Sequence, residues 1–150
     1  AFNGQRCLNA AISTGIAQGA FDAAVEYVRV RAPYGHPVSD FQGIRWMISD
    51  MAAKIEAARL LTYRAAVNAA DGFPSRFESS TAKLFANETV LKVTDWALQM
   101  HGGWGYNKEF PVERFVRDAR GIVLGSGPPQ LHRNMIAHEV LKGRASWANG

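Results

Sequence analysis

Residues 40 to 65 read DFQGIRWMISDMAAKIEAARLLTYRA and carry the clearest helical pattern of the chain. Its apolar and small residues recur at alternating spacings of three and four, which places them on one face of a helix. These residues are Phe41, Ile44, Ile48, Met51, Ile55, Ala58, Thr62 and Ala65. The pattern predicts a long amphipathic helix, with Ser39 or Asp40 as its N-cap.

Two more long helices are predicted, over residues 3–31 and 78–101, on the same spacing rule. Small residues dominate the expected inner face of the first, so a neighbouring helix can pack closely. That face comprises Leu8, Ile12, Ile16, Gly19, Ala20, Ala23 and Tyr27; that of the other comprises Ala82, Phe85, Ala86, Thr89, Val93, Trp96, Ala97 and Met100.

Two shorter helices follow, one opened by Pro111 and ending near Asp118, the other around Leu131–Leu141. Between them, residues 121–129 are rich in glycine and proline and predict a loop. No segment alternates with period two, and neither a repeat nor a linker is visible. The sequence therefore predicts an all-α protein, an antiparallel four-helix bundle with a short extra helix, in one domain spanning residues 1–150.

Composition limits the class of protein. The chain has 150 residues, 47% of them hydrophobic and 20% charged, as in globular proteins. No apolar run reaches the ~18–20 residues of a membrane helix. The net charge of +4 is spread along the chain, without the basic stripe of a nucleic-acid binder. Cys7 is the single cysteine, which excludes an internal disulfide and suits a reducing compartment. Since residue 1 is Ala1, the chain is expected to be a processed product or part of a longer one.

Common catalytic and metal-binding patterns are missing. The histidines at positions 36, 101, 132 and 138 lack metal-ligand spacing, so no metal is expected. His132 and His138 are interpreted as surface or packing residues, and Arg117 with Asp118 as a structural ion pair or cap. No nucleophile elbow occurs.

The stretch from residue 98 to residue 106, LQMHGGWGY, allows two interpretations. Paired glycines bare the backbone, and Gln99, Trp104 and Tyr106 around them suit a flat, polar-edged ligand such as a flavin or a nucleotide. The alternative is a helix C-cap followed by a turn, with both aromatic residues filling the core. These residues alone leave both open.

The order of the motifs resembles the C-terminal helical domain of the acyl-CoA dehydrogenase family, over residues 2–141. Short, branched-chain members such as isobutyryl-CoA dehydrogenases look most similar. The motifs are Arg31-x-x-Tyr34-Gly35, Phe41-Gln42, Asp50-Met51-Ala52, Ala82-Lys83-Leu84-Phe85-Ala86, Gln99 to Tyr106, and Pro111 to Ala119.

This resemblance implies an FAD cofactor shared across a subunit interface of a homo- or hetero-oligomer. The implied substrate is an acyl-CoA thioester, and the implied electron acceptor is an electron-transfer flavoprotein. Arg31 matches the contact to the flavin pyrophosphate, and Asn3 and Arg6 match the acyl-CoA contacts. The other implied FAD contacts are Gln42, Gln99, Met100, His101, Gly102, Gly103 and Gln130.

The implied reaction is α,β-dehydrogenation, in which a carboxylate removes the α-proton. The usual catalytic Glu falls on Ser126 here, and the alternative base position of some members falls on Gln5. Neither is an acid, and a serine hydroxyl is too weak a base to replace one. Pro128 and Pro129 also replace the polar pair that ordinarily follows.

Three hypotheses follow. The chain belongs to an FAD-dependent dehydrogenase whose base is altered or supplied by another subunit. Alternatively, it belongs to a catalytically inactive binding or assembly subunit of a heteromeric dehydrogenase, or to a flavin monooxygenase-like relative. The bacterial cytoplasm is the expected location, with the mitochondrial matrix as the alternative.

Overall fold

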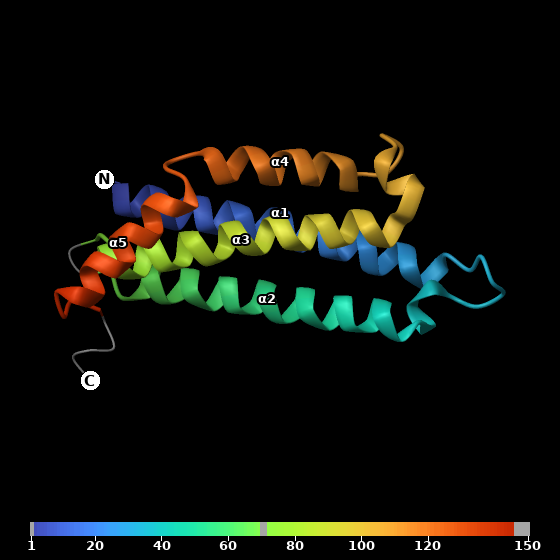
Figure 1. The fold of residues 1–150 in the computed structure, drawn as a ribbon, viewed down its shortest axis with the longest axis horizontal. Helices are drawn as coiled ribbons and strands as arrows, with labels where there is room; N and C mark the ends of the chain where they lie inside the picture. The colour runs from blue at the N-terminus through green and yellow to red at the C-terminus, as the bar shows by residue number, and fades with distance from the viewer. Residues whose placement is uncertain (1, 70–71, 146–150) are drawn as a thin grey trace.

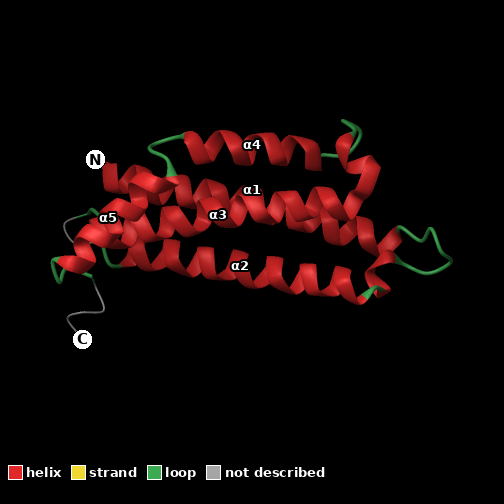
Figure 2. Ribbon diagram, in the orientation of Figure 1, coloured by secondary structure: helices red, strands yellow, loops and turns green. Residues whose placement is uncertain are grey.

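The computed structural model describes residues 2–69 and 72–145, which form α-helices and short 3-10 turns (Figures 1 and 2). The elements are α1 (Phe2–Val30), η1 (Val38–Asp40), α2 (Gln42–Val67), α3 (Arg76–His101), η2 (Gly102–Tyr106), α4 (Val112–Leu124) and α5 (Pro129–Leu141). Helices α1 to α4 alternate in direction, and α5 crosses the bundle where α3 begins (Figure 1). The predicted all-α bundle with an extra short helix is confirmed.

The most extensive contact between elements joins α1 to α3, and these two helices run parallel. Ser13 Oγ donates to Asn87 Oδ1 at 2.9 Å, and the Tyr27 ring stacks on His101 with 4.2 Å between centroids. Both pairs are separated by 74 residues, so the two helices stay in register along most of their length. Fully buried alanines on α1 allow this close approach.

The buried face of α1 differs from the predicted one. Leu8 and Ile12 are 63% and 44% exposed, whereas the buried residues are Arg6, Asn9, Ala10, Ser13, Thr14, Ala17, Ala20, Ala24 and Val28. The helix carries two stripes at helical spacing, and the stripe of smaller side chains packs inward because it brings α1 closer to α3. The larger apolar side chains are left on the surface of this chain.

Helix α2 follows the sequence pattern, since its buried residues are Met51, Ile55, Ala58, Thr62 and Ala65. The predicted N-cap is wrong. Ser39 and Asp40 lie in η1, and Phe41 occupies the N-cap position without a side-chain hydrogen bond.

Two other boundaries are informative. At the start of α3, Ser75 Oγ accepts a hydrogen bond from the backbone N–H of Glu78 at 3.1 Å, which caps the helix. Helix α4 continues to Leu124, well past the predicted end at Asp118. The apolar stripe continues with it, because Ala119 and Val123 are both buried one turn apart.

The close packing of α1 against α3 predicts that a larger side chain placed in this contact destabilises the fold. Ala17→Leu is expected to lower the free energy of unfolding by about 1–3 kcal/mol, because Ala17 is fully buried and the extra atoms have no space. Ala11→Leu on the exposed side of the same helix is the control, and we expect it to stay within about 0.5 kcal/mol of the parent chain. Chemical denaturation measures both, and equal effects would contradict the close α1–α3 contact.

Candidate functional site

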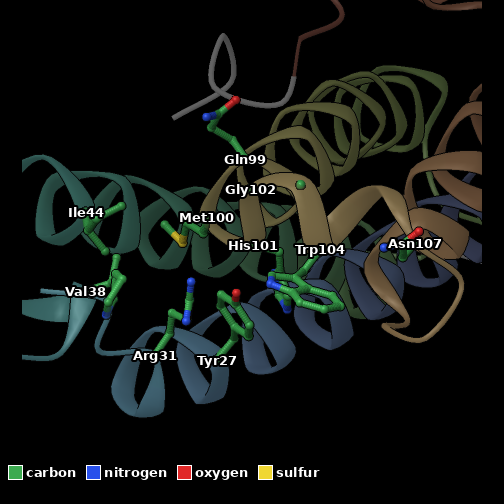
Figure 3. A pocket seen from close by; sticks show the side chains of 12 residues that line it. Tyr27, Arg31, Val38, Ile44, Gln99, Met100, His101, Gly102, Trp104 and Asn107 are labelled. Carbon is green, nitrogen blue, oxygen red and sulfur yellow. The ribbon is translucent and has the colours of Figure 1, made fainter.

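A cavity of about 550 Å³ lies at the end of the bundle where α1 and α3 finish (Figure 3). The end of α1, the following loop, the start of α2, the end of α3 and η2 all contribute to its wall. The lining residues are Tyr27, Arg31, Pro33, Val38, Ile44, Gln99, Met100, His101, Gly102, Gly103, Trp104 and Asn107.

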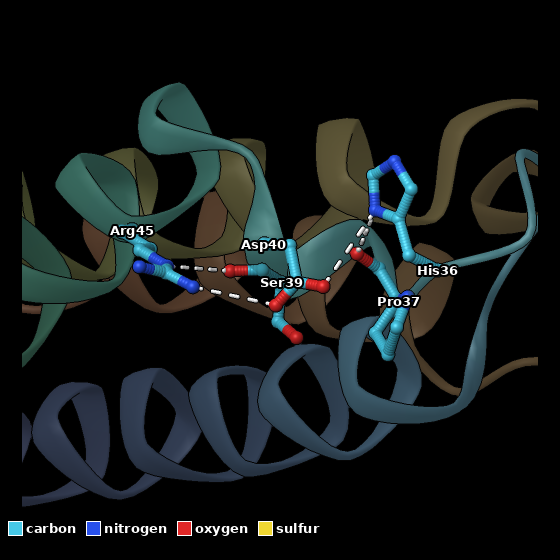
Figure 4. Close-up of polar contacts among 5 residues, drawn as sticks. All are labelled: His36, Pro37, Ser39, Asp40 and Arg45. Carbon is cyan, nitrogen blue, oxygen red and sulfur yellow. Dashed lines mark hydrogen bonds and ion pairs between the residues drawn. The ribbon is translucent and has the colours of Figure 1, made fainter.

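The loop after α1 is folded so that Arg31 faces this cavity. The carbonyl of Arg31 accepts a hydrogen bond from Val38 N at 2.8 Å, which closes the loop. Arg45 on α2 donates from Nε to the Ser39 carbonyl at 2.9 Å and pairs with Asp40 at 3.3 Å (Figure 4). The Arg31 side chain is exposed, and among the described residues it has no acidic partner. Its charge therefore remains available to a ligand.

His101, the last residue of α3, forms the floor of the cavity. It is 3% exposed, and its Nδ1 lies 2.8 Å from the Ala97 carbonyl. Burial lowers the pKa of His101, so the ring is neutral near pH 7. With Nδ1–H donating to a carbonyl, Nε2 is left as a hydrogen-bond acceptor. Stacking on Tyr27 fixes the plane of the ring.

The Gly102–Gly103 pair both ends helix α3 and leaves its backbone exposed, the two features that the sequence suggested. Gly102 has φ +60 and ends α3, as a C-terminal glycine does. A Cβ placed on Gly102 or Gly103 would meet nothing within 4 Å, so bare backbone borders open space there. The expectation that both aromatic residues fill the core is wrong, since Trp104 is 49% exposed and Tyr106 85% exposed.

Gly105 is required for a different reason. A Cβ at this position would lie 2.7 Å from the Leu98 carbonyl oxygen and 2.8 Å from His101 Cβ. Only a glycine therefore lets η2 fold back onto the end of α3 and complete the cavity wall.

The structure brings together most of the residues predicted to contact a cofactor. Six of them line the one cavity, namely Arg31, Gln99, Met100, His101, Gly102 and Gly103. Gln99 is exposed, and its side chain is directed away from Arg31 (Figure 3). Gln42 begins α2 and is not part of the lining.

The remaining predicted residues lie at the opposite end of the bundle, where α1 and α5 begin (Figure 1). Arg6 is 8% exposed and donates to Asn3 Oδ1 at 2.6 Å. Ser126 is exposed with φ +58, a backbone conformation that is uncommon for a residue with a side chain. Gln130 follows it in the first turn of α5. Because α1 has 29 residues, about 43 Å separates the two ends.

Sequence reasoning missed Lys83, which is fully buried on α3. Its Nζ donates to the carbonyls of Gly125 and Gly127 at 2.6 and 2.9 Å. Burial and the charge of Arg6 lower the pKa of Lys83 to about 8. The sequence contains one sign that Lys83 is buried. Lys83 lies on the same helix face as the buried Val90, seven residues further on.

His132 is also fully buried, which agrees with a packing role and excludes a surface position. Its Nε2 lies 3.2 Å from the Gly127 carbonyl. Burial, together with the charges of Lys83 and Arg6, lowers the pKa of His132 to about 4. The ring is therefore neutral near pH 7, and Nε2–H donates to the carbonyl.

The remaining expectations from the sequence concern Arg117, Cys7, metal binding and membrane spans. Arg117 pairs with Glu113 at 2.9 Å one turn away, so it forms a surface ion pair with Glu113 rather than with Asp118. Burial raises the pKa of the Cys7 thiol, which agrees with a packing role. Across residues 2–69 and 72–145, His, Cys, Asp and Glu side chains form no group able to hold a metal. Over the same ranges, no helix has both the length and the apolar character needed to cross a membrane.

The structure is thus a helical domain with one open cavity that Arg31 and the bare Gly102–Gly103 backbone both border. A model of the acyl-CoA dehydrogenase C-terminal domain matches residues 1–141, and the chain belongs to this family. The 3-sulfinopropanoyl-CoA desulfinase of Paraburkholderia xenovorans is 45% identical over 141 residues, which are 94% of this chain and 36% of that protein.

Two solved structures have the same fold. The butyryl-CoA dehydrogenase of Megasphaera elsdenii matches with a TM-score of 0.90 and 36% identity, over 93% of this chain and 37% of that one. A chain in the structure of the electron transferring flavoprotein of Acidaminococcus fermentans matches with a TM-score of 0.91 and 39% identity, over 94% of this chain and 37% of that one. This chain thus spans about a third of the length of the proteins it matches.

The buried imidazole predicts a specific loss of stability in acid. Since the pKa of His132 is about 4 when folded and 6.5 when unfolded, the unfolded state binds more protons between these values. Stability is therefore expected to fall as the pH drops from 6.5 to 4, by on the order of 3 kcal/mol from this group.

The control is His132→Gln, which keeps an N–H donor near the Gly127 carbonyl and cannot titrate. The difference in unfolding free energy between this variant and the parent should grow along that pH range in favour of the variant. A difference that does not change with pH would show that His132 does not titrate with a lowered pKa.

Proposed function

We propose that this chain is the cofactor-contacting domain of an FAD-dependent oxidoreductase that acts on acyl-CoA thioesters. The observation that carries the proposal is that Arg31 and the bare Gly102–Gly103 backbone line the same cavity. A guanidinium binds a phosphate through two parallel hydrogen bonds, and exposed glycine backbone lets a ligand approach closely. These residues fit the pyrophosphate and adenosine part of FAD.

FAD, when bound, would supply a hydride acceptor for the β-hydrogen of the acyl group. The residues of this chain would bind and orient. Arg31 would neutralise phosphate charge, and the neutral His101 would add no further positive charge while offering Nε2 as an acceptor. Asn3 and Arg6, at the other end, would contact the acyl-CoA, with Gln130 beside a flavin.

The distance between the two ends favours an oligomer. With about 43 Å along α1 between them, one cofactor does not reach both regions. Each chain would therefore contribute to two FAD sites, and each site would be completed by another chain. A homo- or hetero-oligomer follows, with residues 1–150 as a single helical domain of a longer protein.

The electron acceptor and the cellular location are proposals as well. An electron-transfer flavoprotein is proposed as the acceptor, supported by the likeness to a chain in the Acidaminococcus fermentans structure. We place the protein in the bacterial cytoplasm, on the bacterial sources of the matching proteins.

A second reaction is favoured by Ser126, which leaves no carboxylate at the usual base position. The Paraburkholderia xenovorans relative is named for removing a sulfino group from an acyl-CoA. In such a reaction the C–S bond breaks, water supplies a hydrogen to carbon and a hydroxyl to sulfur, and the acyl chain is not oxidised. A carboxylate at position 126 would repel the anionic sulfinate, whereas a neutral serine would not.

Replacement of Arg31 tests the cofactor site. In the full-length gene context, Arg31→Ala is expected to lower the affinity for FAD by about tenfold or more, because one charged hydrogen-bond partner is lost. Arg29→Ala, an exposed arginine on the last turn of the same helix, should bind FAD like the parent. Flavin absorbance per protein after dialysis measures both, and full FAD retention by Arg31→Ala would refute the assignment.

Restoring the carboxylate tests the reaction. Under anaerobic conditions, Ser126→Glu is expected to bleach its flavin with butyryl-CoA or isobutyryl-CoA about 10²–10⁴ times faster than the parent, the usual contribution of a general base. Release of sulfite from 3-sulfinopropanoyl-CoA by the parent, without lasting bleaching, would favour the second reaction. Failure of both proteins with every substrate would leave an assembly subunit as the function.

A further inference from the structure

The end of the bundle where α1 begins buries an arginine, a lysine and a histidine close together. Arg6, Lys83 and His132 are 8%, 0% and 0% exposed, and they come from α1, α3 and α5. Among the described residues, no carboxylate contacts the Lys83 ammonium, whose partners are the two backbone carbonyls. A buried charge without an opposite charge costs free energy, so a methionine of similar length would serve packing better. What the lysine adds, and a methionine cannot, is the pair of hydrogen bonds to Gly125 O and Gly127 O.

The two carbonyls that Lys83 binds flank one residue. Gly125 O and Gly127 O both turn inward to Nζ, so the backbone bows around the ammonium. Ser126, between them, has φ +58 and an exposed position. The inward turn of both neighbouring carbonyls therefore directs the side chain at position 126 away from the interior.

The rest of this turn is held from two more sides. Asn9 Nδ2 on α1 donates to the Ile122 carbonyl at 3.0 Å, which fixes the end of α4. His132 Nε2–H reaches Gly127 O from α5. A Cβ at Gly127 would lie 2.9 Å from Leu131 Cδ2, so the turn also packs tightly against α5.

We propose that Lys83 is a positioning residue that holds Gly125–Gly127 so that the side chain of residue 126 faces the bound acyl-CoA. The proposal rests on the acyl-CoA function proposed above. A lysine suits this role because its long side chain reaches from α3 across the interior, and its ammonium donates to two carbonyls at once. A neutral amine still has two N–H groups, so titration of Lys83 does not release the turn.

Mobility at position 126 tests the contact itself. A nitroxide is attached to Ser126→Cys in a Cys7→Ala background of this chain, and its motion is read by electron paramagnetic resonance. Lys83→Met should convert a restricted spectrum into a fast one while the chain stays folded. Lys92→Met removes a lysine from the exposed side of the same helix and should leave the spectrum unchanged.

Lys83→Gln provides a second variant, because it keeps an N–H donor, carries no charge and reaches less far. We expect the label to gain mobility in this variant too. A restricted spectrum in a folded Lys83→Met chain would overturn the proposal. So would failure of both variants to fold, since Lys83 would then be required for folding rather than for positioning.

The effect of Lys83 on the reaction is measured separately, in the full-length Ser126→Glu protein. Adding Lys83→Met should slow anaerobic bleaching by butyryl-CoA about 100-fold, as a displacement of roughly 1 Å does, with the FAD content and the Kd for butyryl-CoA unchanged. Equal bleaching rates would contradict the positioning role. If Ser126→Glu itself does not bleach, the proposed reaction fails while the label measurement still decides the role of Lys83.

Discussion

The parallel, in-register contact between α1 and α3 determines where Arg31, the Gly102–Gly103 pair and Lys83 lie relative to one another. A constant separation of 74 residues pairs Ser13 with Asn87 and Tyr27 with His101. One turn beyond Tyr27, the same alignment of α1 and α3 brings Arg31 to the glycines that end α3. Extended in the other direction, it places the start of α1 beside Lys83. Small residues on α1 make this contact possible, because larger side chains would hold the helices apart.

Much of the fold could be predicted from the sequence, because helical periodicity and glycine stops are local signals. The spacing of Met51, Ile55 and Ala58 predicted the buried face of α2. Gly102 ends α3 as predicted. The buried face of α1 could not be chosen, since a stripe with Leu8 and Ile12 competes with a stripe of alanines. Only the position of α3 decides between them.

The residues around Arg31 could be predicted from the sequence, whereas the buried Lys83 at the other end of the bundle could not. Motif order singled out Arg31 and the glycine pair, and the fold brings them to one cavity. Lys83 was missed for a physical reason. Lysine is rarely buried without a partner, and the partners of Lys83, the carbonyls of Gly125 and Gly127, lie more than 40 residues away in the sequence.

We propose that Arg31 and the Gly102–Gly103 backbone form one chain's share of an FAD site completed by another chain. A crystal structure of the full-length protein with FAD tests it most directly. We expect the FAD pyrophosphate within hydrogen-bond distance of the Arg31 guanidinium, with the flavin ring near residue 126 of a different chain. A cavity that holds only solvent, with FAD bound elsewhere, would rule out this FAD site.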